Sequence, residues 1–210
     1  MPTGTEFLDL ISPQYVSDLV CWGAIGARTA ESQVHRELTS GLSCPMGIKN
    51  STKGDVQIAI DAIKSAQYQH VFLGTTKKGK VAIFKTSGND DTHIILRGGL
   101  EPNYHPKDIE NCRAGLEKNE VNANIMVDFS HGNSQKNHEN QKKVSASICD
   151  QIANGNKDII GVMIESHLKE GNQKISEDME YGKSITDACV NWEETKKLLN
   201  DLAQAVKARR

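Results

Sequence analysis

The sequence predicts an α/β fold in which short buried strands alternate with amphipathic helices, the pattern of β-α units that feed a parallel sheet. Two observations predict it: six short apolar runs are distributed along the chain, and apolar residues at helical spacing lie between several of them. The 210 residues, 37% of them hydrophobic, have the size of one domain that can bury a core without disulfides. We therefore expect a single domain over residues 1–210.

The apolar runs have the length and composition of buried strands. The predicted strands occupy residues 6–10, 23–27, 45–48, 93–96, 124–129 and 159–164. Two further strand-like runs, residues 70–74 and 80–85, indicate a β-hairpin inserted near residues 70–86. Gly74, Gly79 and Lys80 nearly match a phosphate-binding loop, but Lys80 begins a strand where that motif requires a helix, so we reject the match.

Amphipathic helices are predicted where apolar residues recur at helical spacing. The residues that carry this spacing are Val34 and Leu38; Val56, Ile60 and Ile63; Val144, Ile148 and Ile152; and Trp192, Leu199, Leu202 and Val206. Asp55 is expected to be the N-cap of the second helix. The basic residues Lys207, Arg209 and Arg210 suit the C-terminus of the last helix.

Charge and cysteine content exclude several classes of protein. The chain has 25 basic and 27 acidic residues and a net charge of -2, a balance that argues against nucleic-acid binding. Its longest mostly apolar stretch, residues 19–27, is far shorter than the ~20 residues of a membrane-spanning helix. No secretory signal is visible, and the five cysteines form no C-x-x-C pair. We therefore expect a soluble cytoplasmic protein with free thiols and no membrane partner.

Ionisable side chains follow five of the six predicted strands. These residues are Arg28, Lys49, Arg97, His131 and Glu165. In a parallel β/α barrel such positions converge at one mouth, where active sites are found. Each residue alone has a simpler interpretation as a solvated charge, but the ordered set is harder to explain in that way. The three cations would suit a phosphate dianion.

A second subset suits a divalent metal. His131, Glu165 and Asp187 would supply one nitrogen and two oxygen ligands, a mixed set that does not choose among manganese, iron, cobalt and zinc. His131 could instead be a hydrogen-bonded structural histidine. Asp187 could instead be a carboxylate that interacts with a helix N-terminus.

The segments around these residues form longer motifs. They are GAIGARTAESQVHRE (residues 23–37), IILRGG (94–99), VDFSHGNS (127–134), GVMIESH (161–167) with EGNQ (170–173), and SITDAC (184–189). In this order they closely resemble the class I 3-deoxy-D-arabino-heptulosonate 7-phosphate (DAHP) synthases, from about residue 6 to the C-terminus. The resemblance implies a TIM (β/α)8-type barrel, of which the six predicted strands would be strands 3 to 8.

The resemblance also implies an activity. The family members are transferases that condense phosphoenolpyruvate with D-erythrose 4-phosphate and water to give DAHP and phosphate, the first step of the shikimate pathway to the aromatic amino acids. A divalent metal polarises the aldehyde of erythrose 4-phosphate in this chemistry. The family further implies a homo-oligomer and an aromatic amino acid as effector.

Site residues are implied at the matching positions. Those that match the phosphoenolpyruvate-binding cations are Arg28, Lys49 and Arg97, those that match the metal ligands are His131, Glu165 and Asp187, and catalytic roles fall to Lys49 and His131.

The sequence departs from the family pattern in two respects. Ser51 and Lys53 stand where family members usually have Gly and Asp, and Ser51 replaces a glycine suited to an unusual backbone angle. The family's cysteine metal ligand and its Lys-Pro-Arg-Thr phosphate motif, which lie on two earlier strands, are not found. We therefore expect two open sheet edges, three protein ligands for the metal, and negligible synthase activity from this chain alone.

Two alternatives stay open. One is a catalytically incomplete fragment that only binds phosphate or metal, or that associates with full-length subunits. The other is the related 3-deoxy-octulosonate 8-phosphate synthase, which shares the phosphoenolpyruvate chemistry. The SITDAC and DFSHGNS runs favour the DAHP branch.

Overall fold

The computed structural model describes all residues from Met1 to Arg210 and contains two sheets. The larger sheet has six strands in the order β1-β2-β3-β6-β7-β8, and the smaller sheet pairs β4 with β5. The six strands are β1 Gly4–Glu6, β2 Trp22–Ile25, β3 Met46–Lys49, β6 Thr92–Leu96, β7 Ile125–Asp128 and β8 Ile159–Met163. Apart from the hairpin, neighbours in the sheet follow chain order, as consecutive β-α units require. The predicted α/β fold is confirmed.

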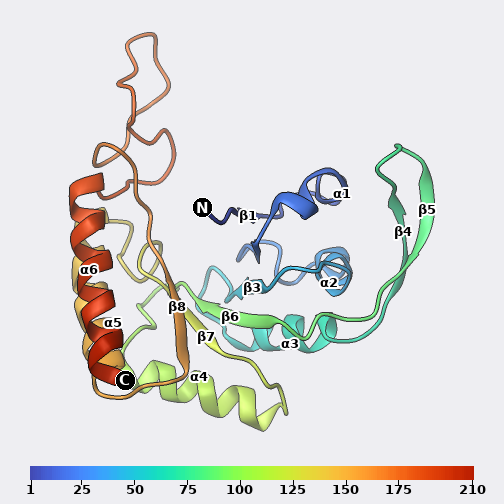
Figure 1. Ribbon diagram of the computed structural model, residues 1–210, viewed down its shortest axis with the longest axis horizontal. Coiled ribbons are helices and arrows are strands. Elements are labelled where there is room, and N and C mark those ends of the chain that lie inside the picture. Colours follow the sequence, from blue (N-terminus) through green and yellow to red (C-terminus); the bar gives the residue numbers. More distant parts are fainter. The chain divides into compact units, whose positions relative to one another are not determined.

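Helices connect these strands (Figure 1). The α-helices are α1 Pro13–Val16, α2 Gln33–Ser40, α3 Gln57–Ala66, α4 Pro106–Lys118, α5 Gln141–Ala153 and α6 Trp192–Arg209, and the 3-10 helices are η1 Ser17–Leu19 and η2 His138–Asn140. The four predicted helices correspond to α2, α3, α5 and α6. None of the helices is both long and apolar enough to cross a bilayer.

The chain divides into two compact units. Unit 1 comprises Met1–Ile95 and Cys112–Ile125, and unit 2 comprises Leu96–Asn111 and Met126–Arg210. The division passes through β6, α4 and β7.

Unit 1 is built on parallel strand pairs. β1 pairs with β2, β2 with β3, and β3 with β6, with Ile25 opposite Ile48 and Ile48 opposite Ile94. These three isoleucines and Met46 are almost fully buried. The β-branched side chains suit the interior of a parallel sheet, which is covered on both faces.

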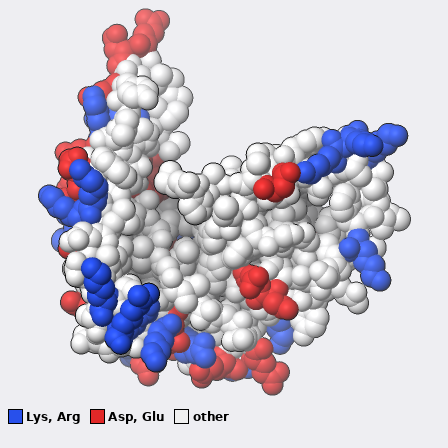
Figure 2. Space-filling view, in the orientation of Figure 1, with Lys and Arg blue, Asp and Glu red and all other residues white.

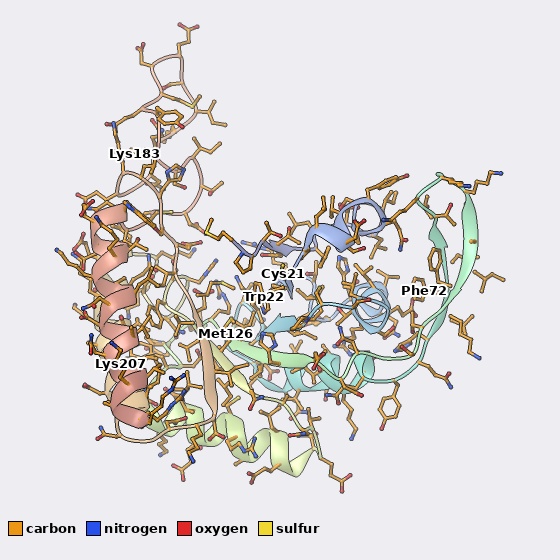
Figure 3. The ribbon with its side chains drawn as sticks, viewed as in Figure 1. Cys21, Trp22, Phe72, Met126, Lys183 and Lys207 are labelled. Carbon is orange, nitrogen blue, oxygen red and sulfur yellow. The ribbon has the colours of Figure 1, made fainter.

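The predicted hairpin is confirmed in unit 1. β4 Val71–Thr75 and β5 Val81–Lys85 pair in antiparallel register, and Gly79, with a φ of +70°, allows the turn. Phe72, labelled in Figure 3, stacks with Phe84 on one face of the hairpin. Basic side chains gather near its turn in Figure 2, where the sequence has Lys77, Lys78 and Lys80. Since no helix follows Lys80, the region is not a phosphate-binding loop.

Unit 2 contains β8, most of β7 and the two helices that follow them. The amide of Phe129 donates to the carbonyl of Met163 at 2.9 Å, which links the ends of these two strands. Helices α5 and α6 lie side by side (Figure 1). The long connection from β8 to α6 is held by isolated bridges that join Ser166 to Val190 and Gly171 to Cys189.

The first predicted strand was misplaced. The structure has β1 at Gly4–Glu6 rather than at residues 6–10. Phe7 is buried, but Leu8 and Leu10 are exposed. The carboxylate of Asp9 accepts hydrogen bonds from the amides of Ile11 and Ser12, so the chain turns there towards α1.

Two helix interpretations were also wrong in detail, and two helices, the short α1 and the longer α4, were missed. Leu38 of α2 is buried as predicted, but Val34 of α2 and Trp192 and Leu199 of α6 are 46–49% exposed. The residues buried instead are Thr39 in α2 and Thr195, Leu198 and Ala205 in α6. Helix α4 was not predicted. Its buried residues Ile109, Cys112 and Leu116 have helical spacing, but charged residues dominate the segment.

Candidate metal centre

His131, Glu165 and Asp187 converge in unit 2. One ligand atom from each lies within 4.8 Å of the others. The Nε2 atom of His131 is 3.6 Å from Oε1 of Glu165 and 3.7 Å from Oδ2 of Asp187. His131 follows β7, Glu165 follows β8, and Asp187 lies in the connection to α6. The structure thus brings together the three residues that the sequence predicts as metal ligands.

The His131 ring is oriented from behind by a buried carboxylate. Its Nδ1 atom lies 2.8 Å from Oδ2 of Asp128, whose side chain is fully buried. A proton on Nδ1 leaves the lone pair of Nε2 facing Glu165 and Asp187, the arrangement common behind metal-bound histidines. The backbone of His131 has a φ of +54°, a conformation that is costly for residues other than glycine and that recurs at functional sites.

Glu165 is half-buried and held at several points. The Ser130 hydroxyl donates to its Oε2 at 2.6 Å. The Gln141 side chain accepts from the Glu165 amide and donates to the Glu165 carbonyl, both at 3.0 Å. Burial, followed by the negative charges of Asp187 and Asp128, raises the pKa of Glu165, although the bond from Ser130 and the charge of His131 oppose this. Gathered carboxylates that repel one another beside an imidazole fit a divalent cation.

Asp187 does not belong to a helix N-terminus. Helix α6 begins at Trp192, and its N-cap is Asn191, which accepts a hydrogen bond from the amide of Glu194. The alternative that explained Asp187 by a helix dipole is therefore wrong. Its side chain is 66% exposed, so it is the most accessible of the three ligand candidates.

The Arg97 loop is bonded to the His131 loop within unit 2. The amides of Gly132 and Asn133 both donate to the carbonyl of Arg97, at 3.0 and 3.3 Å. The approach is so close that a Cβ atom on Gly98 would lie 2.4 Å from the amide nitrogen of Asn133. The buried Asn133 side chain donates to the carbonyls of Leu96 and Asp128, at the ends of β6 and β7. These bonds fix the backbone of Arg97 against the loop that carries His131.

Arg28 and Lys49 lie in unit 1. Lys49 is the last residue of β3 and is only 5% exposed, whereas Arg28 is exposed in the turn after β2. Because β2 and β3 pair in parallel, their carboxyl ends share one edge. The structure thus places both cations at the strand ends expected from the sequence, while Arg97 belongs to unit 2.

The loop after Lys49 accommodates Ser51 without strain. Ser51 is not among the residues with positive φ, so no glycine is required there. Its hydroxyl accepts from the amide of Asp55 at 3.0 Å, and its own amide donates to the Asp55 carbonyl. Asp55 in turn accepts from the Gln57 amide, although the N-cap of α3 is Val56 rather than Asp55 as predicted.

Sequence reasoning missed the residues that support the ligands, namely Asp128, Ser130, Asn133 and Gln141. Asp128 was detectable, because a carboxylate in an otherwise apolar strand is unusual. Gln141 gave no signal, since it is 24 residues from Glu165 along the chain.

Comparison with known proteins agrees with these observations. The model of the DAHP synthetase I family matches residues 1–200. Phe-sensitive phospho-2-dehydro-3-deoxyheptonate aldolase of Escherichia coli K12 is 59% identical over 212 aligned positions, which cover 100% of this chain and 61% of that protein. The Trp-sensitive enzyme of the same organism is 52% identical with the same coverage. The chain therefore spans about 61% of the length of these relatives.

A solved structure is similar over the whole chain. The phospho-2-dehydro-3-deoxyheptonate aldolase of Francisella tularensis SCHU S4 is 56% identical and superimposes with a TM-score of 0.98, covering 100% of this chain and 62% of that one. The predicted partial β/α barrel is confirmed by this neighbour and by the six-stranded sheet. The chain belongs to the DAHP synthetase I family.

Proposed function

We propose that this chain carries the metal centre and the phosphoenolpyruvate-binding cations of a DAHP synthase. The reaction condenses phosphoenolpyruvate with D-erythrose 4-phosphate and water, and releases DAHP and phosphate. The convergence of His131, Glu165 and Asp187 on one point carries the proposal. Membership of the family supports the choice of reaction.

The proposed cofactor is manganese, iron, cobalt or zinc as a divalent ion. Nε2 of His131 and one carboxylate oxygen each from Glu165 and Asp187 would hold it. When bound, the ion acts as a Lewis acid towards the aldehyde oxygen of erythrose 4-phosphate. His131 is catalytic in this proposal because it holds that ion, and Asp128 keeps its ring in position.

Arg28, Lys49 and Arg97 are the proposed ligands of phosphoenolpyruvate. The guanidinium groups of Arg28 and Arg97 match the fork geometry of phosphate and carboxylate oxygens. Lys49 is buried at a strand end, where a charge acts more strongly than in water. This supports a catalytic role in which Lys49 stabilises negative charge that develops on the substrate.

We also propose the domain organisation, the compartment, the effector and the oligomeric state. Strands β6 and β7 run through both units, which supports a single barrel domain over residues 1–210. The five free cysteines favour a reducing compartment, the cytoplasm. Because relatives are named Phe-sensitive and Trp-sensitive, we expect an aromatic amino acid as effector. The exposed apolar face of the hairpin supports a homo-oligomer.

The alternative is that this chain by itself only binds metal or phosphate, or associates with full-length subunits. It is favoured by the chain's length relative to its relatives and by the lack of a Lys-Pro-Arg-Thr motif.

The test compares two histidines in a chain extended to the full length of its relatives. His131→Ala should abolish metal-dependent release of phosphate from phosphoenolpyruvate, because it removes a ligand. His138→Ala should retain activity, because His138 lies in η2 outside the group formed by His131, Glu165 and Asp187. Equal loss in both variants would refute the ligand assignment.

A further inference from the structure

Gln141 makes an unusual pair of bonds to the backbone of Glu165. It is the first residue of α5, and its side chain is fully buried. Strand β8 ends at Met163, so the peptide groups of Glu165 lie beyond the strand. The Gln141 amide supplies both an acceptor and a donor to Glu165, much as a neighbouring strand would. The carbonyl of Glu165 also accepts from the amide of Val190.

Ser130 restrains the Glu165 side chain. It is buried, and its hydroxyl donates to Oε2, while its own amide donates to Oδ1 of Asp128. With Oε2 engaged by Ser130, Oε1 is the oxygen that faces Nε2 of His131 at 3.6 Å. Ser130 therefore orients the carboxylate of Glu165 so that its other oxygen faces His131.

Burying a glutamine amide is costly unless both ends are satisfied. A long apolar side chain could fill the same space, but it would take away the acceptor of the Glu165 amide and one of the two donors to the Glu165 carbonyl. A buried polar group with a bonded donor and a bonded acceptor favours one arrangement of its partners. The partner of Gln141 is the backbone of Glu165, one of the three candidate metal ligands.

We propose that Gln141 and Ser130 are positioning residues that hold Glu165 in the geometry of a metal ligand. Gln141 fixes its backbone, and Ser130 fixes its carboxylate. Neither side chain contributes an atom to the ligand group. The inference rests on the proposed function, since it requires a metal at His131, Glu165 and Asp187.

The test measures Mn²⁺ binding by the electron paramagnetic resonance of free ion, and Co²⁺ coordination by visible absorption. Ser130→Ala and Gln141→Met should each weaken Mn²⁺ binding about 10- to 100-fold, the usual effect of losing a partner behind a ligand. Both variants should also alter the Co²⁺ spectrum, because a displaced Glu165 changes the ligand field. The thermal midpoint of metal-free Ser130→Ala should stay close to that of the unaltered chain.

Gln151→Met is the matched control. Gln151 lies on the same helix, is also buried, and donates to the carbonyl of Tyr104 at 2.9 Å. Because it does not contact the ligand residues, its replacement should leave Mn²⁺ affinity and the Co²⁺ spectrum unchanged. Equal weakening by Gln151→Met would overturn the proposal, since any lost amide in α5 would then have the same effect.

Glu165→Ala distinguishes failure of the proposed metal centre from failure of the proposed positioning role. If Glu165→Ala does not weaken Mn²⁺ binding, the metal centre itself is wrong. If Glu165→Ala abolishes binding while Ser130→Ala and Gln141→Met leave affinity and spectrum unaltered, the metal centre stands and the positioning role is refuted. Should Gln141→Met fail to fold, Ser130→Ala decides the question alone.

Discussion

His93 of unit 1 has a buried imidazole that accepts a hydrogen bond from an indole two strands away. Nε1 of Trp22, on β2, donates to Nε2 of His93, on β6, at 3.0 Å. Trp22 is labelled in Figure 3. Strand β3 lies between them and has Gly47 at this level, so no side chain intervenes. Burial lowers the pKa of His93 from 6.5 to about 4, which keeps the imidazole neutral at neutral pH.

This histidine should make stability depend on pH. Because the folded pKa is about 4 and the unfolded value is 6.5, the unfolded chain binds more protons between these values. The contribution of His93 to the free energy of unfolding is thus fully present above about pH 6.5 and declines as the pH falls towards 4. At 1.36 kcal/mol per pKa unit, the decline amounts to about 3 kcal/mol. Urea unfolding of the unaltered chain and of His93→Gln, from pH 4.5 to 7.5, measures the difference.

The control is His105→Gln, which replaces an exposed histidine. It should retain the pH dependence of the unaltered chain, whereas His93→Gln should lose the His93 part. If the free energy of unfolding depended on pH in the same way in the unaltered chain and in His93→Gln, the prediction would be contradicted.

The contact between Trp22 and His93 also requires a glycine at position 47, on the strand between them. A Cβ atom there would lie 2.5 Å from Cδ1 of Ile95 and 2.9 Å from Nε2 of His93. Gly47→Ala should therefore lower the free energy of unfolding by about 2 kcal/mol through overpacking. Gly115→Ala is the control, because that glycine lies within α4 and a Cβ atom would meet only Cδ1 of Ile60, at 3.1 Å. Its chemical denaturation midpoint should stay equal or rise, since alanine favours helices. A loss as large as that of Gly47→Ala would show that crowding at Gly47 is not the cause.

At the scale of the secondary-structure elements, the hairpin β4–β5 presents an apolar face to solvent. Val71, Leu73, Val81 and Ile83 alternate along its two strands and are 65–76% exposed. Their opposite face carries Phe72 and Phe84, which line a pocket with Leu38 and Leu42 of the α2 region. One face of the hairpin is therefore half-buried and faces the α2 region of unit 1, and the other is free to bury apolar area against a second copy.

The double variant Leu73→Lys with Ile83→Lys should reduce self-association. Light scattering coupled to size-exclusion chromatography should show a smaller mass for the variant than for the unaltered chain. The thermal midpoint of a monomer should change little, because neither side chain is buried. Lys78→Gln, in the nearby turn, provides the control and should keep the original mass. An unchanged mass in the double variant would show that the hairpin is not part of the interface between copies.

Local sequence patterns identified the elements better than their buried faces. Strands β2, β3, β6, β7 and β8 and the hairpin were predicted because each is a short apolar run with clear boundaries. The buried faces of α2 and α6 were only partly predicted. Leu38 is buried as expected, but Thr39 and Thr195 are buried too, because their hydroxyls donate to the carbonyls of His35 and Asn191, which periodicity does not show. Gln141 was missed for a different reason, since only folding brings it to Glu165, 24 residues away along the chain.

At the scale of the whole molecule, metal binding and turnover should separate. His131, Glu165 and Asp187 all lie in unit 2, and one ligand atom from each is within 4.8 Å of the others. The resemblance to the family implies a fourth ligand, a cysteine, and a Lys-Pro-Arg-Thr motif for the second phosphate, and that motif is absent from these residues. The chain spans about 61% of its relatives.

We therefore expect the 210-residue chain to bind Mn²⁺ yet to form no DAHP from phosphoenolpyruvate and erythrose 4-phosphate. Three protein ligands suffice to bind a divalent ion, whereas turnover also requires erythrose 4-phosphate to be oriented against the ion, and orientation accounts for a large part of a bimolecular rate. Isothermal titration with Mn²⁺ and a colorimetric assay for DAHP measure the two properties on one preparation. The His131→Ala variant shows whether the bound ion occupies the proposed centre, because it should remove the titration signal. Turnover that requires added metal and both substrates would contradict the expectation, and would mean that the cations and ligands of this chain suffice for catalysis.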